Sequence, residues 1–137
     1  MDRKPLLKVV CAILEHRGKI LAVRRKTGEQ NEGCWEFPGG KVKDHETYEM
    51  SICREMREEL DLEVEPIKIL PYVDYEYPEF HIRLIPVLCK RVSGRIKYRV
   101  HDLHRWLRTP ELLNLHWSQA DALLLKRMMP VISRLIL

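Results

Sequence analysis

The chain has 137 residues, of which 45% are hydrophobic and 32% are charged, and its formal net charge is +4. This length and composition are typical of one globular domain, so we expect residues 1–137 to form a single domain. No apolar run exceeds six residues, far below the roughly 20 that a membrane-spanning helix needs, and we exclude a membrane partner. The small basic excess is spread over both halves of the chain, which permits an anionic ligand without requiring nucleic acid.

The N-terminal residues and the cysteines indicate a cytoplasmic protein. The first five residues lead into a short apolar run and lack the long apolar region of a secretory signal. The four cysteines form no Cys-x-x-Cys pair, and three of them lie in apolar runs or on an expected helical stripe. We therefore interpret them as buried thiols instead of disulfides or zinc ligands. The sequence leaves the oligomeric state open.

The first forty residues predict a hairpin followed by two loops. Residues 6–15 are rich in Val, Ile and Leu, residues 20–23 are apolar, and Gly18 lies between the two segments, which is typical of two antiparallel strands. A polar loop is expected over residues 26–33. Residues 35–40 end in Pro-Gly-Gly, where the backbone must turn sharply or let another group approach closely. We interpret this second loop as part of a site.

A helix is expected over residues 46–60, because this segment contains no Pro or Gly. Its apolar residues recur at the spacing of one helix face: Met50, Cys53, Met56 and Leu60. Beyond it, segments bounded by Pro, Gly or Asp predict strands over residues 63–70, 71–77, 81–91 and 96–100.

Two helices are expected to close the chain. Thr109 offers an N-cap before a proline, and Ser118 with Asp121 resembles a capping box that opens a helix over residues 119–129. Pro130 should kink or break this last helix.

Three glutamates share one face of the helix expected over residues 46–60. Glu55, Glu58 and Glu59 lie at i, i+3 and i+4, and a helix turns by about 100° per residue. One interpretation is a solvated face that Arg54 and Arg57 neutralise. The other is a site for a hard divalent cation such as Mg²⁺, which binds oxygen ligands and would offset the repulsion among the carboxylates. The Gly-Gly loop upstream favours the second, as do three cationic side chains suited to a polyphosphate: Arg24, Arg25 and Lys41.

The residues from Gly40 onwards carry a family resemblance. Gly40 is followed after five residues by Glu46, and after seven more by Arg54-Glu55-Met56-Arg57-Glu58-Glu59-Leu60-Asp61-Leu62. This spacing resembles the Nudix box, G-x5-E-x7-R-E-U-x-E-E-x-G-U, in which U is apolar. One position departs from it, because Asp61 replaces the late glycine. That glycine resembles a helix C-cap, and Asp tolerates the left-handed conformation, so we expect the departure to affect stability more than chemistry.

The resemblance implies the Nudix fold, which is an α+β fold with an α/β/α sandwich around a mixed β-sheet. Segments outside the box are similar to MutT-type nucleoside triphosphate pyrophosphohydrolases, including the CTP pyrophosphohydrolases: residues 35–42, 75–78 and 120–121. For such enzymes the family implies Mg²⁺-assisted attack of water on a phosphorus, which releases pyrophosphate and a nucleoside monophosphate. Mn²⁺ is an alternative ion, and the number of ions is left open.

The resemblance also implies roles for individual residues. Glu55, Glu58 and Glu59 would hold the metal together with Gly39 and would activate the water. Arg54 would join them as a catalytic residue that orients the glutamates, and Glu46 would fix the loop of the box or belong to the outer shell of the metal. The residues expected to bind substrate are Arg25, Phe37, Gly40, Lys41 and Asp121.

Alternatives remain open for three of these residues. Arg24 is the alternative to Arg25 as a phosphate contact, because successive side chains of a strand point to opposite faces. Phe37 has an alternative place in the core. Asp121 has one as the capping-box partner of Ser118.

Two departures from relatives bear on the substrate. Many relatives have Glu before a His where this chain has Val100-His101-Asp102, so the carboxylate is either absent or replaced by Asp102 or His101. The alternative for His101 is a histidine of the core or the surface. Phe80 and Asp121 stand where MutT has Arg and Asn. A carboxylate accepts a hydrogen bond from an amino group such as cytosine N4, so Asp121 favours CTP-type substrates.

The alternative substrate is 8-oxo-dGTP, because a protonated Asp121 would donate a hydrogen bond to an oxidised purine. Neither the base nor the sugar is settled by the sequence. A non-catalytic Nudix-like domain that binds a nucleotide or nucleic acid is the alternative of another class. It is disfavoured because all four glutamates of the box are present.

Overall fold

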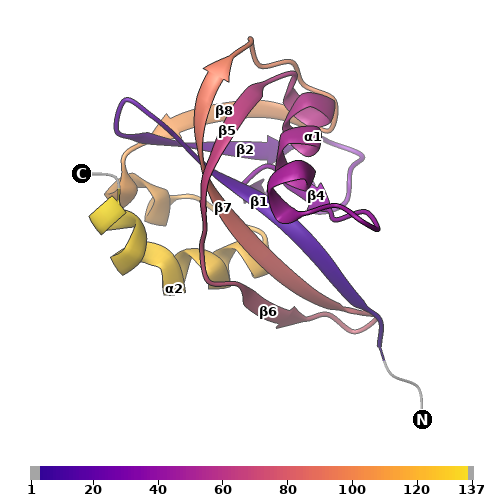
Figure 1. Ribbon diagram of the computed structural model, residues 1–137. Helices are drawn as coiled ribbons and strands as arrows, with labels where there is room; N and C mark the ends of the chain where they lie inside the picture. Colours follow the sequence, from indigo (N-terminus) through magenta and orange to yellow (C-terminus); the bar gives the residue numbers. More distant parts are fainter. Residues whose placement is uncertain (1–3, 136–137) are drawn as a thin grey trace.

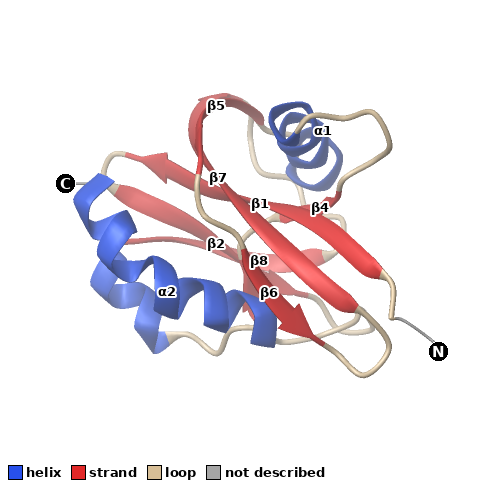
Figure 2. Cartoon of the chain, turned by 60° about the horizontal axis from the view of Figure 1, so that its bottom comes forward, coloured by secondary structure: helices blue, strands red, loops and turns tan. Residues whose placement is uncertain are grey.

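The protein is an eight-stranded sheet with helices on both faces (Figures 1 and 2). The computed structural model describes residues 4–135. The central strands have the order β3-β2-β1-β7-β5, and β4, β6 and β8 pair with β1, β7 and β2. The elements are β1 (Leu6–His16), β2 (Lys19–Arg25), β3 (Trp35–Glu36), β4 (Gly39–Lys41), α1 (Tyr48–Leu60), β5 (Glu63–Ile69), β6 (Val73–Glu76), β7 (His81–Ser93), β8 (His101–Leu107), the 3-10 helix η1 (Thr109–Asn114) and α2 (Gln119–Leu135).

Helix α1 covers one face of the sheet and α2 covers the other (Figure 2), which confirms the expected α+β fold with an α/β/α sandwich. The sheet is mixed, because β1 and β7 are parallel whereas the other pairs of named strands are antiparallel. The central strands are apolar on both faces. Val10 and Leu14 of β1 pack in one cluster with Met56 of α1. Ile13 packs in the other with Leu124 of α2. No helix within residues 4–135 combines the length and the apolar character that crossing a membrane requires.

The predicted first hairpin is confirmed. Strands β1 and β2 are antiparallel, and His16 lies opposite Lys19. The turn residues Arg17 and Gly18 both have positive φ, 53° and 79°, as a type I′ turn requires. The hairpin places the end of β2, with its two arginines, beside β3 and β8.

Helix α1 begins at Tyr48 instead of at residue 46. Thr47 is its N-cap, and the Thr47 Oγ1 accepts a hydrogen bond from the Met50 N–H at 3.1 Å. Met50, which we expected on the buried face, is 57% exposed, and Ile52 is buried in its place. The apolar stripe is therefore rotated slightly from the predicted one.

The end of α1 agrees with the expectation for the position that departs from the family pattern. Asp61 follows Leu60 in the left-handed conformation, with φ at 57°, and its N–H bonds to the Arg57 carbonyl at 3.1 Å. An aspartate thus performs the capping turn that is usually made by glycine.

The strand predicted over residues 96–100 is wrong, because these residues form a loop and strand β8 begins only at His101. Gly94 has a φ of 106° just after β7, and the Lys97 N–H bonds to the Leu60 carbonyl at 3.0 Å. The segment is thereby held against the end of α1. Strand β8 has no apolar alternation, and pairing with β2 defines it.

The C-terminal helices also differ from the prediction. The helix expected from Thr109 is a short 3-10 helix, and α2 continues through Pro130 to Leu135. Pro130 is exposed, so the hydrogen bond that its missing N–H forgoes lies on the solvent side of the helix.

The two glycines of β4 let this strand lie against both β1 and α1. A Cβ on Gly39 would overlap the Val10 carbonyl, and a Cβ on Gly40 would overlap the Glu55 carboxylate. Gly39 is also the antiparallel partner of Cys11. Only glycine allows both approaches, and they bring the β4 backbone directly against the glutamate face of α1.

The C-cap generates a prediction about stability. Asp61→Gly should raise the free energy of unfolding by about 0.5–1 kcal/mol, because glycine adopts the left-handed conformation without a Cβ clash. Asp61→Val should lower it by about 1 kcal/mol or more. Urea titrations measure both, and the exposed contact of Asp61 with Lys97 at 3.7 Å contributes little to either. A lower urea midpoint for Asp61→Gly would contradict the C-cap interpretation.

Candidate active site

The guanidinium of Arg54 joins the acidic residues of the box. Its Nε and Nη2 bond to the two oxygens of Glu46 at 2.6 and 2.8 Å. Its Nη1 bonds to Glu55 at 2.8 Å and to Glu58 at 3.1 Å. Nη2 also bonds to the Lys41 carbonyl at 3.1 Å. The hydrogen bonds from Arg54 lower the pKa of Glu46 to about 2, so this carboxylate stays charged.

Glu59 lies where α1 faces β4. Its Oε1 accepts a hydrogen bond from the Gly39 N–H at 3.1 Å. Burial raises the pKa of Glu59 to about 8, and the negative charges of Glu36 and Glu55 act in the same direction. A bound cation would favour the charged form of this carboxyl group.

Glu55, Glu58 and Glu59 fit a divalent cation in their chemistry and in their place. All three are on α1 and offer carboxylate oxygens as metal ligands. The absence of a Cβ at Gly40 leaves the space that the Glu55 carboxylate occupies. Within residues 4–135, no three His, Cys, Asp or Glu side chains already converge as ligands. Arg54 instead bonds to two of the glutamates. If these two turned toward Glu59, they would complete the oxygen-only set that Mg²⁺ prefers.

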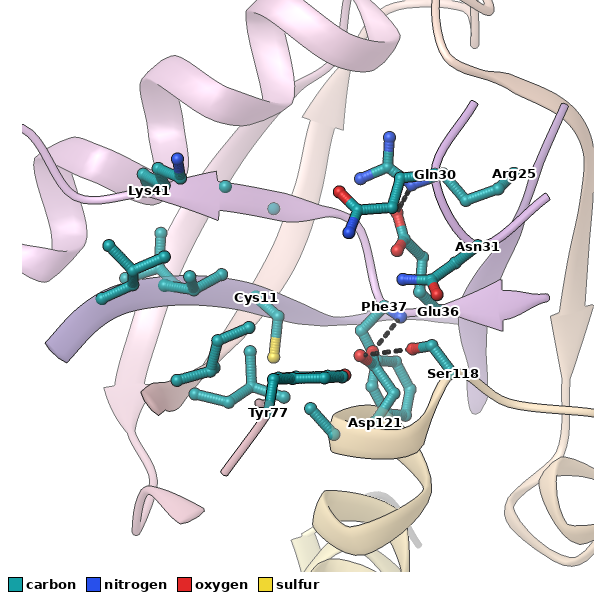
Figure 3. Close-up of a pocket in the computed structure, with 18 of the residues that line it drawn as sticks. Cys11, Arg25, Gln30, Asn31, Glu36, Phe37, Lys41, Tyr77, Ser118 and Asp121 are labelled. Carbon is teal, nitrogen blue, oxygen red and sulfur yellow. Dashed lines mark hydrogen bonds and ion pairs between the residues drawn. The ribbon is translucent and has the colours of Figure 1, made fainter. Parts of the chain in front are cut away.

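A cavity of about 280 Å³ lies next to this acidic face (Figure 3). Gly39, Gly40 and Lys41 form the part of its wall that adjoins α1, while Arg25 and Asp121 come from β2 and α2. Much of the remaining wall is apolar or aromatic: Cys11, Phe37, Tyr77, Phe80, Ile82 and Leu84. The cavity therefore offers apolar surface and charged groups to one ligand.

The structure brings all the expected substrate-binding residues to this one cavity: Arg25, Phe37, Gly40, Lys41 and Asp121. Arg24, the alternative to Arg25, points elsewhere and makes two bonds to Asp102, at 2.9 and 3.0 Å. Neither Arg24 nor Asp102 lines the cavity, so Asp102 supplies no carboxylate to it. Phe37 is 3% exposed and packs on Trp117, with ring centroids 4.6 Å apart, so it belongs to both the core and the cavity wall.

Asp121 is held in place by two hydrogen bonds. Its Oδ2 accepts from the Phe37 N–H at 2.8 Å, and its Oδ1 accepts from the Ser118 hydroxyl at 2.9 Å. The Ser118 N–H donates to the Trp35 carbonyl, so the expected capping box does not close. Burial raises the pKa of Asp121 to about 7, with a smaller contribution from the charge of Glu36.

Sequence reasoning assigned no role to several residues of the cavity. Glu36 is the most important, because its Oε2 lies 3.0 Å from Arg25 Nε and 2.8 Å from His101 Nε2. A signal was available in the sequence, since Glu36 stands between two aromatic residues, Trp35 and Phe37. Both are buried in the structure. Gln30 and Asn31 also line the cavity (Figure 3). They belong to a polar loop without periodicity, and no pattern identifies them.

Comparison with known families decides the affiliation. The sequence model of the NUDIX domain matches residues 4–136. The chain belongs to the NUDIX family. This protein is thus a Nudix hydrolase, and the family acts on small nucleotide substrates and uses divalent metal ions.

Two curated relatives illustrate the range of similarity. A CTP pyrophosphohydrolase of Escherichia coli (strain K12) is 35% identical over 120 residues, which cover 85% of this chain and 78% of the relative. An 8-oxo-dGTP diphosphatase of Proteus vulgaris is 34% identical over 84 residues, which cover 61% of this chain and 75% of the relative.

Solved structures agree with the fold. The solution structure of the E. coli ORF135 protein has a TM-score of 0.82 and 30% identity, covering 93% of this chain and 91% of that one. The MutT NUDIX hydrolase from Burkholderia pseudomallei has a TM-score of 0.78 and 27% identity, covering 90% of this chain and 98% of that one.

The buried Asp121 predicts an unusual dependence of stability on pH. Its pKa is raised on folding, so between about pH 4 and pH 7 the unfolded chain loses this proton while the folded protein keeps it. This group therefore lowers stability as pH rises through that window. Asp121→Asn keeps both hydrogen bonds, because its amide accepts from Phe37 and donates to Ser118. Its melting temperature relative to the wild type should rise from about pH 4 to about pH 7.

Thermal melts across this pH range measure the difference. Asp102→Asn is the matched control, because bonding to Arg24 lowers the pKa of Asp102. The stability that Asp102 contributes is lost only below about pH 4, so the melting temperature of this variant should keep a nearly constant difference from the wild type between about pH 4 and pH 7. Parallel curves for the wild type and Asp121→Asn would rule out the raised pKa.

Proposed function

We propose that this Nudix hydrolase is a Mg²⁺-dependent nucleoside triphosphate pyrophosphohydrolase of the CTP pyrophosphohydrolase type, with Mn²⁺ as an alternative ion. It would convert a nucleoside triphosphate and water to a nucleoside monophosphate and pyrophosphate. The observation that carries the proposal is the combination of residues that line one cavity. Its wall contains the buried Asp121, an arginine, and the glycine strand that touches the glutamates of α1. A base, a phosphate chain and a cation would each find a matching group there.

The phosphate chain would lie near Arg25 and Lys41. Both line the cavity, and both are cationic side chains of the kind that bind phosphates. Glu55, Glu58 and Glu59 would hold the cation, which when bound supplies positive charge to the phosphates and lowers the pKa of water. Gly40 lies between the two groups of residues, because it lines the cavity and a Cβ on it would overlap the Glu55 carboxylate.

Arg54 would organise the glutamates without contacting the substrate. Its hydrogen bonds to Glu55 and Glu58 fix the positions of these carboxylates before a cation binds. The two bonds to Glu46 fix the guanidinium to the loop that precedes α1. Glu46 therefore serves the site through Arg54, as an outer residue of the kind that tunes metal sites.

The base would lie against the aromatic residues of the cavity and near Asp121. Phe37, Tyr77 and Phe80 offer ring surfaces for stacking. Both Asp121 oxygens accept one hydrogen bond from the protein, and each retains a lone pair for a donor of the ligand. The exocyclic amino group of cytosine is such a donor. The similarity to a CTP pyrophosphohydrolase over 85% of the chain supports the same choice.

A second candidate, the hydrolysis of 8-oxo-dGTP, rests on the raised pKa of Asp121. At a pKa of about 7, a large part of the carboxyl groups is protonated at neutral pH, and the proton would be donated to a carbonyl of an oxidised purine. The similarity to an 8-oxo-dGTP diphosphatase supports this candidate as well. The cytoplasmic location expected from the sequence stays a prediction.

A pyrophosphate-release screen over canonical and oxidised nucleoside triphosphates tests the proposal. With Mg²⁺, CTP or dCTP should give the highest kcat/KM, and EDTA should abolish turnover. Asp121→Asn should reduce the discrimination between cytosine and purine nucleotides by about tenfold, the effect of one buried hydrogen bond. The preference for cytosine should strengthen from about pH 6 to about pH 8, because the accepting carboxylate form of Asp121 increases.

The screen also separates the two candidates. A marked preference for 8-oxo-dGTP that weakens as pH rises would assign the protein to the second candidate. Full turnover in EDTA would contradict the metal-dependent reaction for either substrate.

A further inference from the structure

A buried histidine lies behind the cavity and takes no part in its wall. His101 is 1% exposed and begins β8, where its Cα is paired with that of Arg25 in β2. Its Nε2 lies 2.8 Å from Glu36 Oε2. Because a carboxylate only accepts hydrogen bonds, Nε2 carries the proton and donates it. Glu36 is thus held from the interior of the protein.

The same oxygen of Glu36 also contacts Arg25. Arg25 Nε lies 3.0 Å from Glu36 Oε2, but its N–H does not point along that line, so the contact is an ion pair without a hydrogen bond. Only three buried side-chain polar atoms within residues 4–135 have no hydrogen-bond partner, and two of them are Arg25 Nε and His101 Nδ1. The Nε–H of Arg25 at the cavity wall therefore makes no hydrogen bond within the protein, which leaves the guanidinium able to bind an anion.

We propose that His101 is a positioning residue: its hydrogen bond holds Glu36 away from a full pairing with Arg25, so that the guanidinium remains available to substrate phosphates. The proposal rests on the proposed function, in which Arg25 binds the phosphate chain. Without the donor at His101, Glu36 would be free to turn both oxygens to Arg25 as a bidentate pair. The arginine would then compete poorly for phosphate.

The neighbouring ion pair shows the contrast within the same two strands. Arg24 of β2 and Asp102 of β8 form the bidentate pair that Arg25 and Glu36 do not form, with bonds of 2.9 and 3.0 Å. No histidine holds Asp102 from the other side among the contacts of the described residues. Asp102 lies outside the cavity, so Asp102→Asn is a matched control that alters an arginine–carboxylate pair beside the site.

The test is a double-mutant cycle that combines His101→Leu with Arg25→Gln. His101→Leu should raise KM for CTP about tenfold with little change in kcat, the scale expected for weakening one charged contact. It should have no further effect in the Arg25→Gln background, because His101 acts through Arg25. His101→Gln should restore most of the loss, since its amide offers a donor near the position of Nε2. Asp102→Asn should behave as the wild type.

Additive effects of the two substitutions, or a His101→Gln variant as impaired as His101→Leu, would overturn the proposal. If a thermal melt shows that His101→Leu does not fold, the same cycle is run with His101→Phe. That substitution keeps a ring in the buried position but offers no donor to Glu36, and it should be silent in the Arg25→Gln background. Additivity there overturns the proposal as well.

Calorimetric binding of inorganic tripolyphosphate separates this inference from the proposed function. Affinity for this probe should follow the same pattern across the variants even if no nucleoside triphosphate is hydrolysed. The pattern present without turnover would reject the proposed function and keep the role of His101. Turnover of CTP without this pattern of affinities would keep the proposed function and reject the role of His101.

Discussion

The candidate active site of this protein depends on the guanidinium of Arg54. It bonds to Glu46 before α1, to Glu55 and Glu58 within α1, and to the carbonyl of Lys41 in β4. Without such a cation, like charges at this helical spacing would repel one another. One side chain therefore fixes the loop, the helix and the glycine strand relative to each other. The proposed cation site rests on that fixed arrangement, because Glu55 and Glu58 would then need only to turn their carboxylates toward Glu59 to bind an ion.

The cavity beside the acidic face of α1 concentrates negative charge that the fold only partly compensates. Burial raises the pKa of Glu59 to about 8 and that of Asp121 to about 7, and Glu36 contributes to both shifts. Arg25 is the cationic side chain that lowers both pKa values. Such a set is costly in an empty site and is well matched to a ligand that brings cations with its phosphates. Because burial brings the pKa of Asp121 to about 7, this side chain changes between hydrogen-bond donor and acceptor near neutral pH. The base that it would bind therefore depends on its protonation.

The sequence predicted the parts of this protein that local rules control. The apolar spacing and the absence of Pro and Gly predicted α1, and Asp61 was expected to tolerate the left-handed conformation that it has, because helix spacing and capping act over a few residues. Strand β8 was missed because its side chains carry no apolar alternation and its place comes from pairing with β2. His101 and Glu36 are 65 positions apart in the sequence, and local sequence periodicity cannot predict a contact over that separation. The choice between Arg24 and Arg25 likewise needed the register of β2, which the sequence left open.

The most direct measurement of the central claim is the affinity of the apo protein for Mn²⁺, followed by its electron paramagnetic resonance signal, in the wild type and in Arg54→Gln. Removing a positive charge from among the glutamates should tighten cation binding if Arg54 merely neutralises them. If Arg54 assembles the site, its loss should instead weaken binding by about 10- to 100-fold, as is typical when a residue that orients metal ligands is removed. Arg57→Gln on the same helix, whose arginine pairs with Glu63 at 2.8 Å, should leave the affinity near that of the wild type. Tighter or unchanged Mn²⁺ binding by a folded Arg54→Gln variant would contradict the claim that Arg54 assembles the site.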